Sequence, residues 1–191
     1  MAFTVRRAVL THVCPVRAII AIVLMPKHNR GMDSLSTKSI ADLLALHAAI
    51  MEELRARDVL RSANNPTGDL AEYVFCVAFG WAQENNSAKA FDATGDDGTR
   101  YQIKGRRIHR RNRSRQLSAI RDLDGFDILA AVLFDDDYCI MRAALISAAV
   151  VREHSTYIEH TNSHKFLLRD AIWDAPGVID VTDRLREVEC A

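Results

Sequence analysis

The run from Phe126 to Phe134, FDILAAVLF, constrains the fold more than any other stretch because it is almost continuously apolar. A strand with one face in water alternates apolar and polar side chains, whereas a strand covered on both faces is apolar throughout. The run therefore predicts a strand buried on both faces of its sheet. The three Asp residues at 135–137 predict a polar turn, and Tyr138 to Ile146 predicts the returning strand.

Two amphipathic helices are expected before this hairpin, because apolar residues recur there at three- and four-residue spacing. The stripe of the first, which runs from about 40 to 57, consists of Ile40, Leu43, Leu44, His47, Met51 and Leu54. The second has Thr67 as its expected cap and is apolar nearly all round, which predicts that it is largely buried.

The remaining elements complete the expected fold. In chain order the prediction is helices at 40–57 and 67–81, a hairpin at 91–105, a short helix at 116–123, the hairpin at 126–146, a helix at 147–151, a strand at 166–169 and a helix at 183–188. This order predicts an α/β (α+β) domain, with a mixed β-sheet flanked by helices. A chain of 191 residues that is 49% hydrophobic and 26% charged suits one such domain.

The chain is expected to have three parts. Residues 1–33 predict an N-terminal extension that begins at an upstream start, with Met32 as a second start and a signal peptide as the alternative. The apolar run in this part, Ala18 to Met25, is far shorter than the roughly 20 residues that span a bilayer. Residues 34–60 predict an N-terminal helix packed on the core, and 61–191 the core domain.

The charge and the cysteines narrow the functional classes. The formal net charge is zero, so only a local patch could attract nucleic acid. The four cysteines are scattered and form no C-x-x-C pair, which favours reduced thiols over a disulfide framework or a zinc site. We therefore expect a cytoplasmic protein without a membrane span.

A second hairpin, at Phe91 to Arg107, carries polar side chains in a regular pattern. Its sequence is FDATGDDGTRYQIKGRR, and the Gly-Asp-Asp-Gly segment predicts a tight turn. Side chains alternate along a strand, so Tyr101 and Ile103 share one face and Gln102 and Lys104 share the other. The simplest interpretation is a surface hairpin with a polar outer face.

The same pattern also fits a catalytic site. If the two strands pair, Asp92 lies next to Gln102 and Lys104, and a carboxylate, an amide oxygen and an ammonium converge. Oxygen ligands suit a hard divalent cation, and an ammonium suits an attacking water or a phosphate. This combination is what hydrolysis of a phosphodiester requires.

Glu72 lies among the apolar residues of the second helix. A buried carboxylate is costly unless it is paired or coordinates a cation. Two interpretations are open: an ion pair with an arginine, or a metal ligand beside Asp92.

A run of basic residues follows the second strand of this hairpin. Its members are Arg106, Arg107, His109, Arg110, Arg111, Arg113 and Arg115. Such a run is commonly a solvated loop. Because the guanidinium group matches phosphate oxygens, we expect these residues to contact nucleic acid.

The order Asp92, then Gln102-Ile103-Lys104, resembles the motif of the PD-(D/E)XK nuclease superfamily. That motif is an Asp, a gap, then Glu or Gln, any residue and Lys. Residues from about 57 to 187 also resemble a bacterial family of restriction-endonuclease-like proteins. The stretches that carry this likeness are NNPTGDLAEYVF, FDATGDDGTRYQIKGRR, FDILAAVLFDDDYCIMRAALI and VIDVTDRLR.

The resemblance implies a restriction-endonuclease-like core that hydrolyses phosphodiester bonds in DNA with Mg²⁺, or alternatively Mn²⁺. It implies that Asp92 and Glu72 hold the metal and that Gln102 offers an amide oxygen or orients the water. Lys104 would stabilise charge on the water or the phosphate. Nucleases of this kind often act as homodimers, which makes a dimer compatible with the chain.

Two departures from the family pattern keep other functions open. Gln102 replaces an acidic residue, which leaves less negative charge to hold Mg²⁺. The superfamily core also has three strands before its second helix, whereas only two are evident here, unless one lies within Gln83 to Lys89. The alternatives are a catalytically inactive nucleic-acid-binding module on the same fold and a structural or interaction protein.

Overall fold

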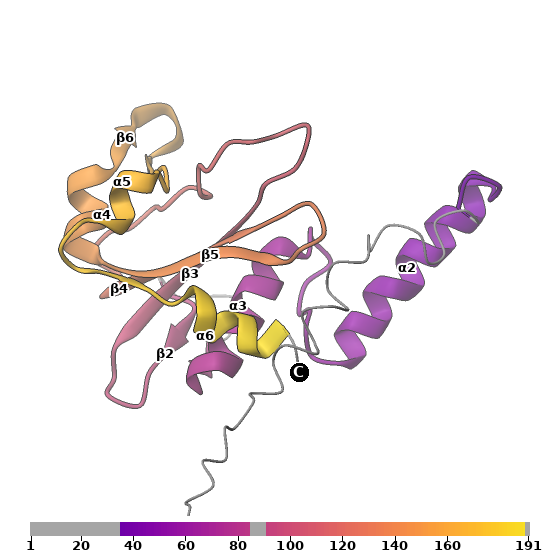
Figure 1. Cartoon of the computed structure of the whole chain (residues 1–191), viewed down its shortest axis with the longest axis horizontal. Coiled ribbons are helices and arrows are strands. Elements are labelled where there is room, and N and C mark those ends of the chain that lie inside the picture. The colour runs from indigo at the N-terminus through magenta and orange to yellow at the C-terminus, as the bar shows by residue number, and fades with distance from the viewer. Residues whose placement is uncertain (1–34, 85–90, 190–191) are drawn as a thin grey trace, which may run out of the picture. The chain divides into compact units, whose positions relative to one another are not determined.

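The computed structural model describes residues 35–84 and 91–189 (Figure 1). The expected N-terminal extension at 1–33 therefore lies outside the described residues. The chain divides into two compact units, 1–49 and 50–191, and each is described by itself.

The helices agree with the sequence pattern in most places. They are α2 (Ile40–Ala56), α3 (Thr67–Phe79), α4 (Ala148–His154), α5 (Asp170–Trp173) and α6 (Thr182–Glu189), with a 3-10 turn η1 (Glu159–Thr161). The strands are β1 (Ala82–Gln83), β2 (Ala93–Thr94), β3 (Arg100–Arg107), β4 (Ile128–Phe134), β5 (Ile140–Ser147), β6 (Thr156–Ile158), β7 (Ser163–Lys165) and β8 (Val178–Asp180).

The described strands form one mixed sheet and a separate small hairpin. The sheet has the order β1-β2-β3-β4-β5-β8, and β6 pairs with β7. β3 and β4 run parallel, while the other neighbours in the sheet run antiparallel. The predicted α+β class, with a mixed sheet flanked by helices, is confirmed. β1 supplies a third strand before the crossover, and it overlaps the stretch where a hidden strand was expected only at Gln83, since 85–89 lie outside the described residues.

The central strand β4 is buried on both faces, as its apolar sequence predicts. Leu129 and Ala131 pack into one hydrophobic cluster, whereas Ala130 and Val132 pack into another on the opposite side. Helices α3 and α6 cover the second side and lie together in Figure 1. Segments from the β3–β4 connection, α4 and α5 cover the first side.

Helix α3 is less buried than its composition suggested. Only its stripe of Ala71, Val74 and Phe75 is fully buried, and Val77 on another side is 53% exposed. The expected cap is also wrong, because Thr67 is the first helical residue and Pro66 occupies the cap position. The prediction that this helix is largely buried therefore holds fully only for this stripe, since one stripe is enough to fill the space against β3.

The expected helix at 116–123 does not form. Leu117 and Ile120 point inward as expected, but their N–H groups donate to the carbonyls of Phe166 and His164 at 3.1 Å each. Pairing with this distant segment satisfies the backbone and replaces the helical hydrogen bonds. The expected strand at 166–169 does not form either, because β7 ends at Lys165. The segment instead pairs with the β3–β4 connection.

Helix α2 confirms the first helical prediction. At its start Ser39 Oγ accepts the N–H of Asp42 at 3.1 Å, while Ser39 N–H donates to the Asp42 carboxylate at 3.3 Å. This reciprocal pair caps the helix. Because α2 crosses the boundary between the two units, its expected packing on the core stays a prediction. In the described part of the chain no helix has the length and apolarity to cross a membrane.

Candidate functional site

Asp92, directly before β2, lies opposite Gln102 of the neighbouring strand β3. Ala93 pairs with Tyr101 in the β2–β3 register, which places Asp92 beside Gln102. Gln102 Nε2 donates to Asp92 Oδ2, and the main-chain N–H of Ile103 donates to the same oxygen at 2.7 Å. The structure thus brings together two of the residues that the motif singled out.

Strand β3 presents two chemically different faces, which explains this placement. Tyr101 and Ile103 are 9% and 4% exposed and pack toward α3. The Tyr101 ring also stacks on Trp81, with 3.6 Å between the ring centroids. These apolar contacts hold one face of β3 inward, so Gln102 and Lys104 must lie on the other face.

Lys104 is half-buried two residues beyond Gln102 on that face. Within residues 35–84 and 91–189, its ammonium has no hydrogen-bond or ion-pair partner. A lysine in this state can bind an anion without first breaking an internal pair.

Glu72 lies on the opposite side of the sheet from Asp92 and Gln102. It lies on α3, and its Oε2 accepts a hydrogen bond from Gln83 Nε2 at 2.7 Å. Gln83 pairs with Ala93 in the β1–β2 register and therefore shares the α3 side of the sheet. Asp92 lies on the side of Gln102, so the structure does not join Glu72 directly to the Asp92–Gln102 pair.

Electrostatics nonetheless couples Glu72 to Asp92. Burial raises the pKa of Glu72, and the negative charge of Asp92 raises that pKa further. The hydrogen bond from Gln83 and the charge of Arg61 act in the opposite direction. Arg61 NH1 lies 3.9 Å from Glu72 Oε2, which is the arginine pairing left open by the sequence.

Two contributors to this region were not anticipated. The Glu84 N–H donates to the Asp92 carbonyl at 2.9 Å, and the Glu84 side chain accepts from Thr94 Oγ1 at 3.0 Å. The Arg61 guanidinium donates to the Glu84 carbonyl at 3.1 Å. Nothing in the local sequence marks Glu84, because its position depends on the pairing of the short strand β1 with β2.

The charges of the acidic groups would attract a hard cation, but the described protein ligands do not surround it. Asp92 and Glu72 are close enough to repel, so a divalent cation near them would be electrostatically favoured. In the part of the chain that the structure describes, no three His, Cys, Asp or Glu side chains are arranged to hold a metal. Mg²⁺ commonly uses one or two carboxylates and completes its shell with water and phosphate. A cation held at Asp92 would therefore complete its shell with water and phosphate.

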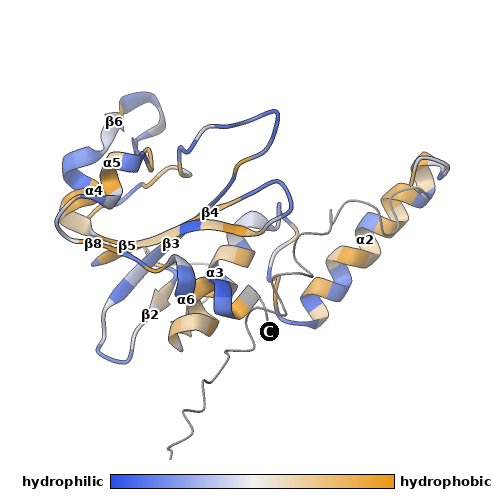
Figure 2. Cartoon of the chain, viewed as in Figure 1, coloured by the Kyte–Doolittle hydropathy of each residue, from blue (hydrophilic) through white to orange (hydrophobic). Residues whose placement is uncertain are grey.

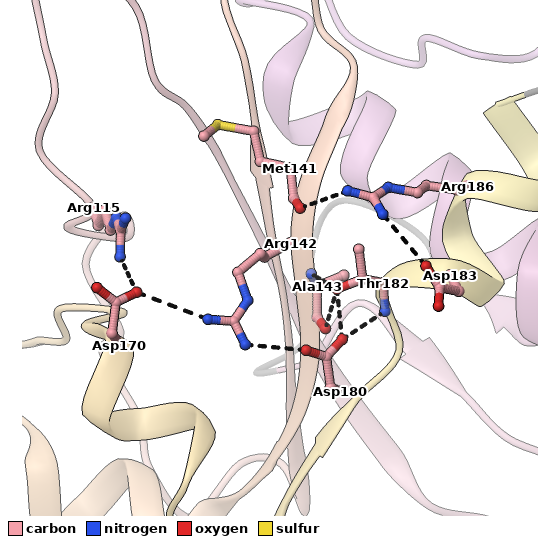
Figure 3. A network of polar contacts seen from close by, with 9 residues as sticks. All are labelled: Arg115, Met141, Arg142, Ala143, Asp170, Asp180, Thr182, Asp183 and Arg186. Carbon is pink, nitrogen blue, oxygen red and sulfur yellow. Dashed lines mark hydrogen bonds and ion pairs between the residues drawn. The ribbon is translucent and has the colours of Figure 1, made fainter. Parts of the chain in front are cut away.

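Part of the basic run has structural partners. Arg107 donates to the carbonyl of Asp136 at 3.1 Å and lies over the Tyr138 ring. Arg115 NH1 donates to Asp170 at 2.6 Å, and Asp170 in turn lies 3.8 Å from Arg142 (Figure 3). These ion pairs connect the basic run to the turn after β4 and to α5.

Three other arginines of the run are turned to solvent. Arg110, Arg111 and Arg113 are exposed, and the Arg110 side chain is 88% exposed although its Nε lies 4.0 Å from Asp136 Oδ2. The loop after β3 that carries them is largely hydrophilic in Figure 2. The run thus contains Arg107 and Arg115, whose short ion pairs hold the loop, and the exposed Arg110, Arg111 and Arg113, of which only Arg110 has a long ion pair among the described residues.

Comparison of the chain with protein-family models gave no match, and comparison with curated proteins gave none either. The family resemblance of the sequence therefore stays a prediction, and the function has to be argued from the site itself.

Proposed function

We propose that this chain is a metal-dependent endonuclease that hydrolyses phosphodiester bonds in DNA. The observation that carries the proposal is the pairing of Asp92 with Gln102 across β2 and β3, with Lys104 further along the same face of β3. A carboxylate, an amide and an ammonium that has no partner among the described residues match, on one small surface, the needs of phosphodiester hydrolysis.

Each side chain has a distinct role in this proposal. Asp92 would hold Mg²⁺ or Mn²⁺, which would supply Lewis-acid polarisation of the phosphate, and Glu72, expected from the sequence as a second ligand, would favour the cation through its charge from the α3 side of the sheet. Gln102 and the Ile103 N–H fix one oxygen of Asp92, which leaves Oδ1 toward a cation. Lys104 stabilises negative charge on the phosphate, and the exposed arginines bind the DNA backbone.

A binding module that does not cut DNA is the second candidate. It is favoured by the Gln102 side chain, whose amide nitrogen faces Asp92 and adds no negative charge to the site. In this alternative the basic loop binds DNA and the acidic pair has no catalytic role. A homodimer and a cytoplasmic location stay predictions under either candidate.

Cleavage of plasmid DNA in Mg²⁺ and in Mn²⁺ tests the proposal. We expect Asp92→Asn and Lys104→Ala to abolish cleavage, with Asp96→Asn and Lys165→Ala as matched exposed controls that retain it. Without metal, Asp92→Asn should bind DNA at least as well as the wild type, because it loses a charge that repels phosphate. Lys104→Ala should not bind better, because it loses a cation.

The outcomes separate the candidates. Cleavage by Asp92→Asn at the wild-type rate would refute the catalytic role of Asp92. If neither the wild type nor Gln102→Glu cleaves with either cation while both bind DNA, the chain is a binding module. If binding to DNA is absent or does not weaken with salt, a structural or interaction protein remains.

A further inference from the structure

A polar cavity of about 260 Å³ lies where the start of α3 meets the end of β3 and the loop after it. It is lined by Asn65 and Thr67, by Gly105 and Arg106, and by His109 and Asn112. Pockets for drug-sized ligands begin at about 300 Å³, so this cavity suits a small group rather than a large organic molecule.

The cavity depends on a close contact between β3 and α3. A Cβ atom on Gly105 would lie 2.7 Å from the Thr67 carbonyl oxygen and 2.8 Å from Ala71 Cβ. Only a residue without a side chain lets the strand and the helix approach this closely. The close contact between β3 and α3 therefore forms the base of the pocket.

The side-chain oxygens of Asn65 and Asn112 already accept hydrogen bonds from backbone N–H groups. Asn65 Oδ1 accepts the Thr67 N–H at 3.1 Å and the Thr67 hydroxyl at 2.6 Å. Asn112 Oδ1 accepts the Ser114 N–H at 3.0 Å. A backbone N–H needs an acceptor, so each amide must place its oxygen inward and is left with its NH₂ group for a ligand.

His109 follows the same pattern. Its Nδ1 accepts the Arg111 N–H at 3.3 Å, so the proton of the neutral ring is on Nε2. Asn65, Asn112 and His109 thus offer mainly donors to anything that enters the pocket, whereas the Thr67 hydroxyl, which donates to Asn65, offers acceptor capacity.

The charged side chains that line the pocket are arginines, and one of them is paired with an aspartate. Arg106 donates through Nε to the Ser114 carbonyl at 3.0 Å, and Arg107, which also lines the pocket, pairs with Asp136. The residues that line the pocket include no carboxylate. Donors that converge beside a guanidinium group are the chemistry that recognises a phosphate.

We propose that this pocket binds a phosphate group of a nucleic acid. The nature of the ligand rests on the proposed function, whereas the donor-lined cavity does not. The phosphate can come from a chain end, as a monoester, or from within the chain, as a diester. Both present oxygen acceptors and negative charge, and the experiment separates them.

The variant Asn65→Asp tests the pocket without removing its structural role. A carboxylate keeps the acceptor that Thr67 uses, and Asp is as good as Asn at a helix start. It replaces the outward NH₂ donor with a negative oxygen. Asn64→Asp is the matched control, because it adds the same charge one residue earlier and does not line the pocket.

Three probes are titrated at low ionic strength: inorganic phosphate, a 5′-phosphorylated oligonucleotide and the same oligonucleotide with a 5′-hydroxyl. We expect Asn65→Asp to weaken binding of inorganic phosphate about tenfold or more relative to Asn64→Asp, because a charge-assisted donor is lost. Equal binding by the two variants would overturn the proposal.

The oligonucleotides identify the source of the phosphate. A loss confined to the 5′-phosphorylated probe assigns the pocket to a chain end, whereas an equal loss for both assigns it to an internal diester. No loss for either overturns the proposal for nucleic acid. None of these titrations depends on cleavage, so a chain that binds phosphate here but never cuts DNA contradicts only the nuclease.

Discussion

Asp92 accepts the main-chain N–H of Ile103 at 2.7 Å, which makes its carboxylate part of the connection between β2 and β3. The residue that the motif marks as catalytic therefore also has a structural role. Substitutions at this position have to separate the two roles, because loss of activity alone does not distinguish a lost ligand from a displaced strand.

We predict that Asp92→Ala lowers the free energy of unfolding by about 1–3 kcal/mol, because the half-buried Ile103 N–H loses its acceptor. Asp92→Asn should lose less, since its amide oxygen can accept the same bond. Urea unfolding with chelator present measures both variants. Equal stability of Asp92→Ala and the wild type would show that this hydrogen bond contributes nothing.

Gln102→Glu should make stability depend on the divalent cation. Without metal the new carboxylate faces Asp92 and repels it, which lowers the melting temperature. Saturating Mg²⁺ should restore stability, by about 2.7 kcal/mol at a hundred times the dissociation constant. Differential scanning fluorimetry with and without Mg²⁺ measures this, with Gln116→Glu as the control. The same Mg²⁺ response in both variants would argue against a cation at Asp92.

Gly105→Ala should destabilise the domain by about 1–3 kcal/mol, because a Cβ there meets the Thr67 carbonyl and Ala71. Gly68→Ala is the control, on the helix α3 that Gly105 contacts, where a Cβ meets nothing within 4 Å. It should stabilise by about 0.4–1 kcal/mol through the unfolded state. Chemical unfolding of both variants is the measurement, and opposite signs are the expected result.

Removal of the exposed arginines should weaken DNA binding without affecting the fold. The triple alanine variant at Arg110, Arg111 and Arg113 should flatten the log–log salt dependence by about one unit for each phosphate that the protein no longer neutralises. Thermal stability should change little, since exposed charges contribute little. The control removes Arg57, Arg121 and Arg169, and an identical salt slope for the two triple variants would place DNA elsewhere.

Cys76 reports on the charge of Glu72. Burial raises the pKa of the Cys76 thiol to about 11, and the carboxylates of Glu72 and Asp92 contribute to the increase. Glu72→Gln removes one of these charges, so the pKa should fall and alkylation near pH 9 should accelerate. The rate is measured against pH with the other cysteines replaced by serine, and Glu153→Gln is the control. An unchanged profile would mean that Glu72 is protonated or distant.

Local patterns in the sequence determined much of the sheet and part of the site. The alternation in Tyr101-Gln102-Ile103-Lys104 predicted which side chains of β3 are buried, and the apolar run at 126–134 predicted a strand covered twice. Both succeed because strand geometry fixes the direction of each side chain, and the burial of apolar groups then selects the face. The same strand geometry places Asp92 beside Gln102.

Only the tertiary structure decided the features that depend on distant partners. Residues 116–123 have helical spacing but hydrogen-bond to His164 and Phe166, because a backbone group is satisfied equally by a remote segment. Arg107 and Arg115 of the basic run are held by short ion pairs because Asp136 and Asp170 lie beside them, a placement that the run itself does not encode. The phosphate pocket needs the start of α3 beside β3, a contact between segments about forty residues apart, which no local pattern encodes.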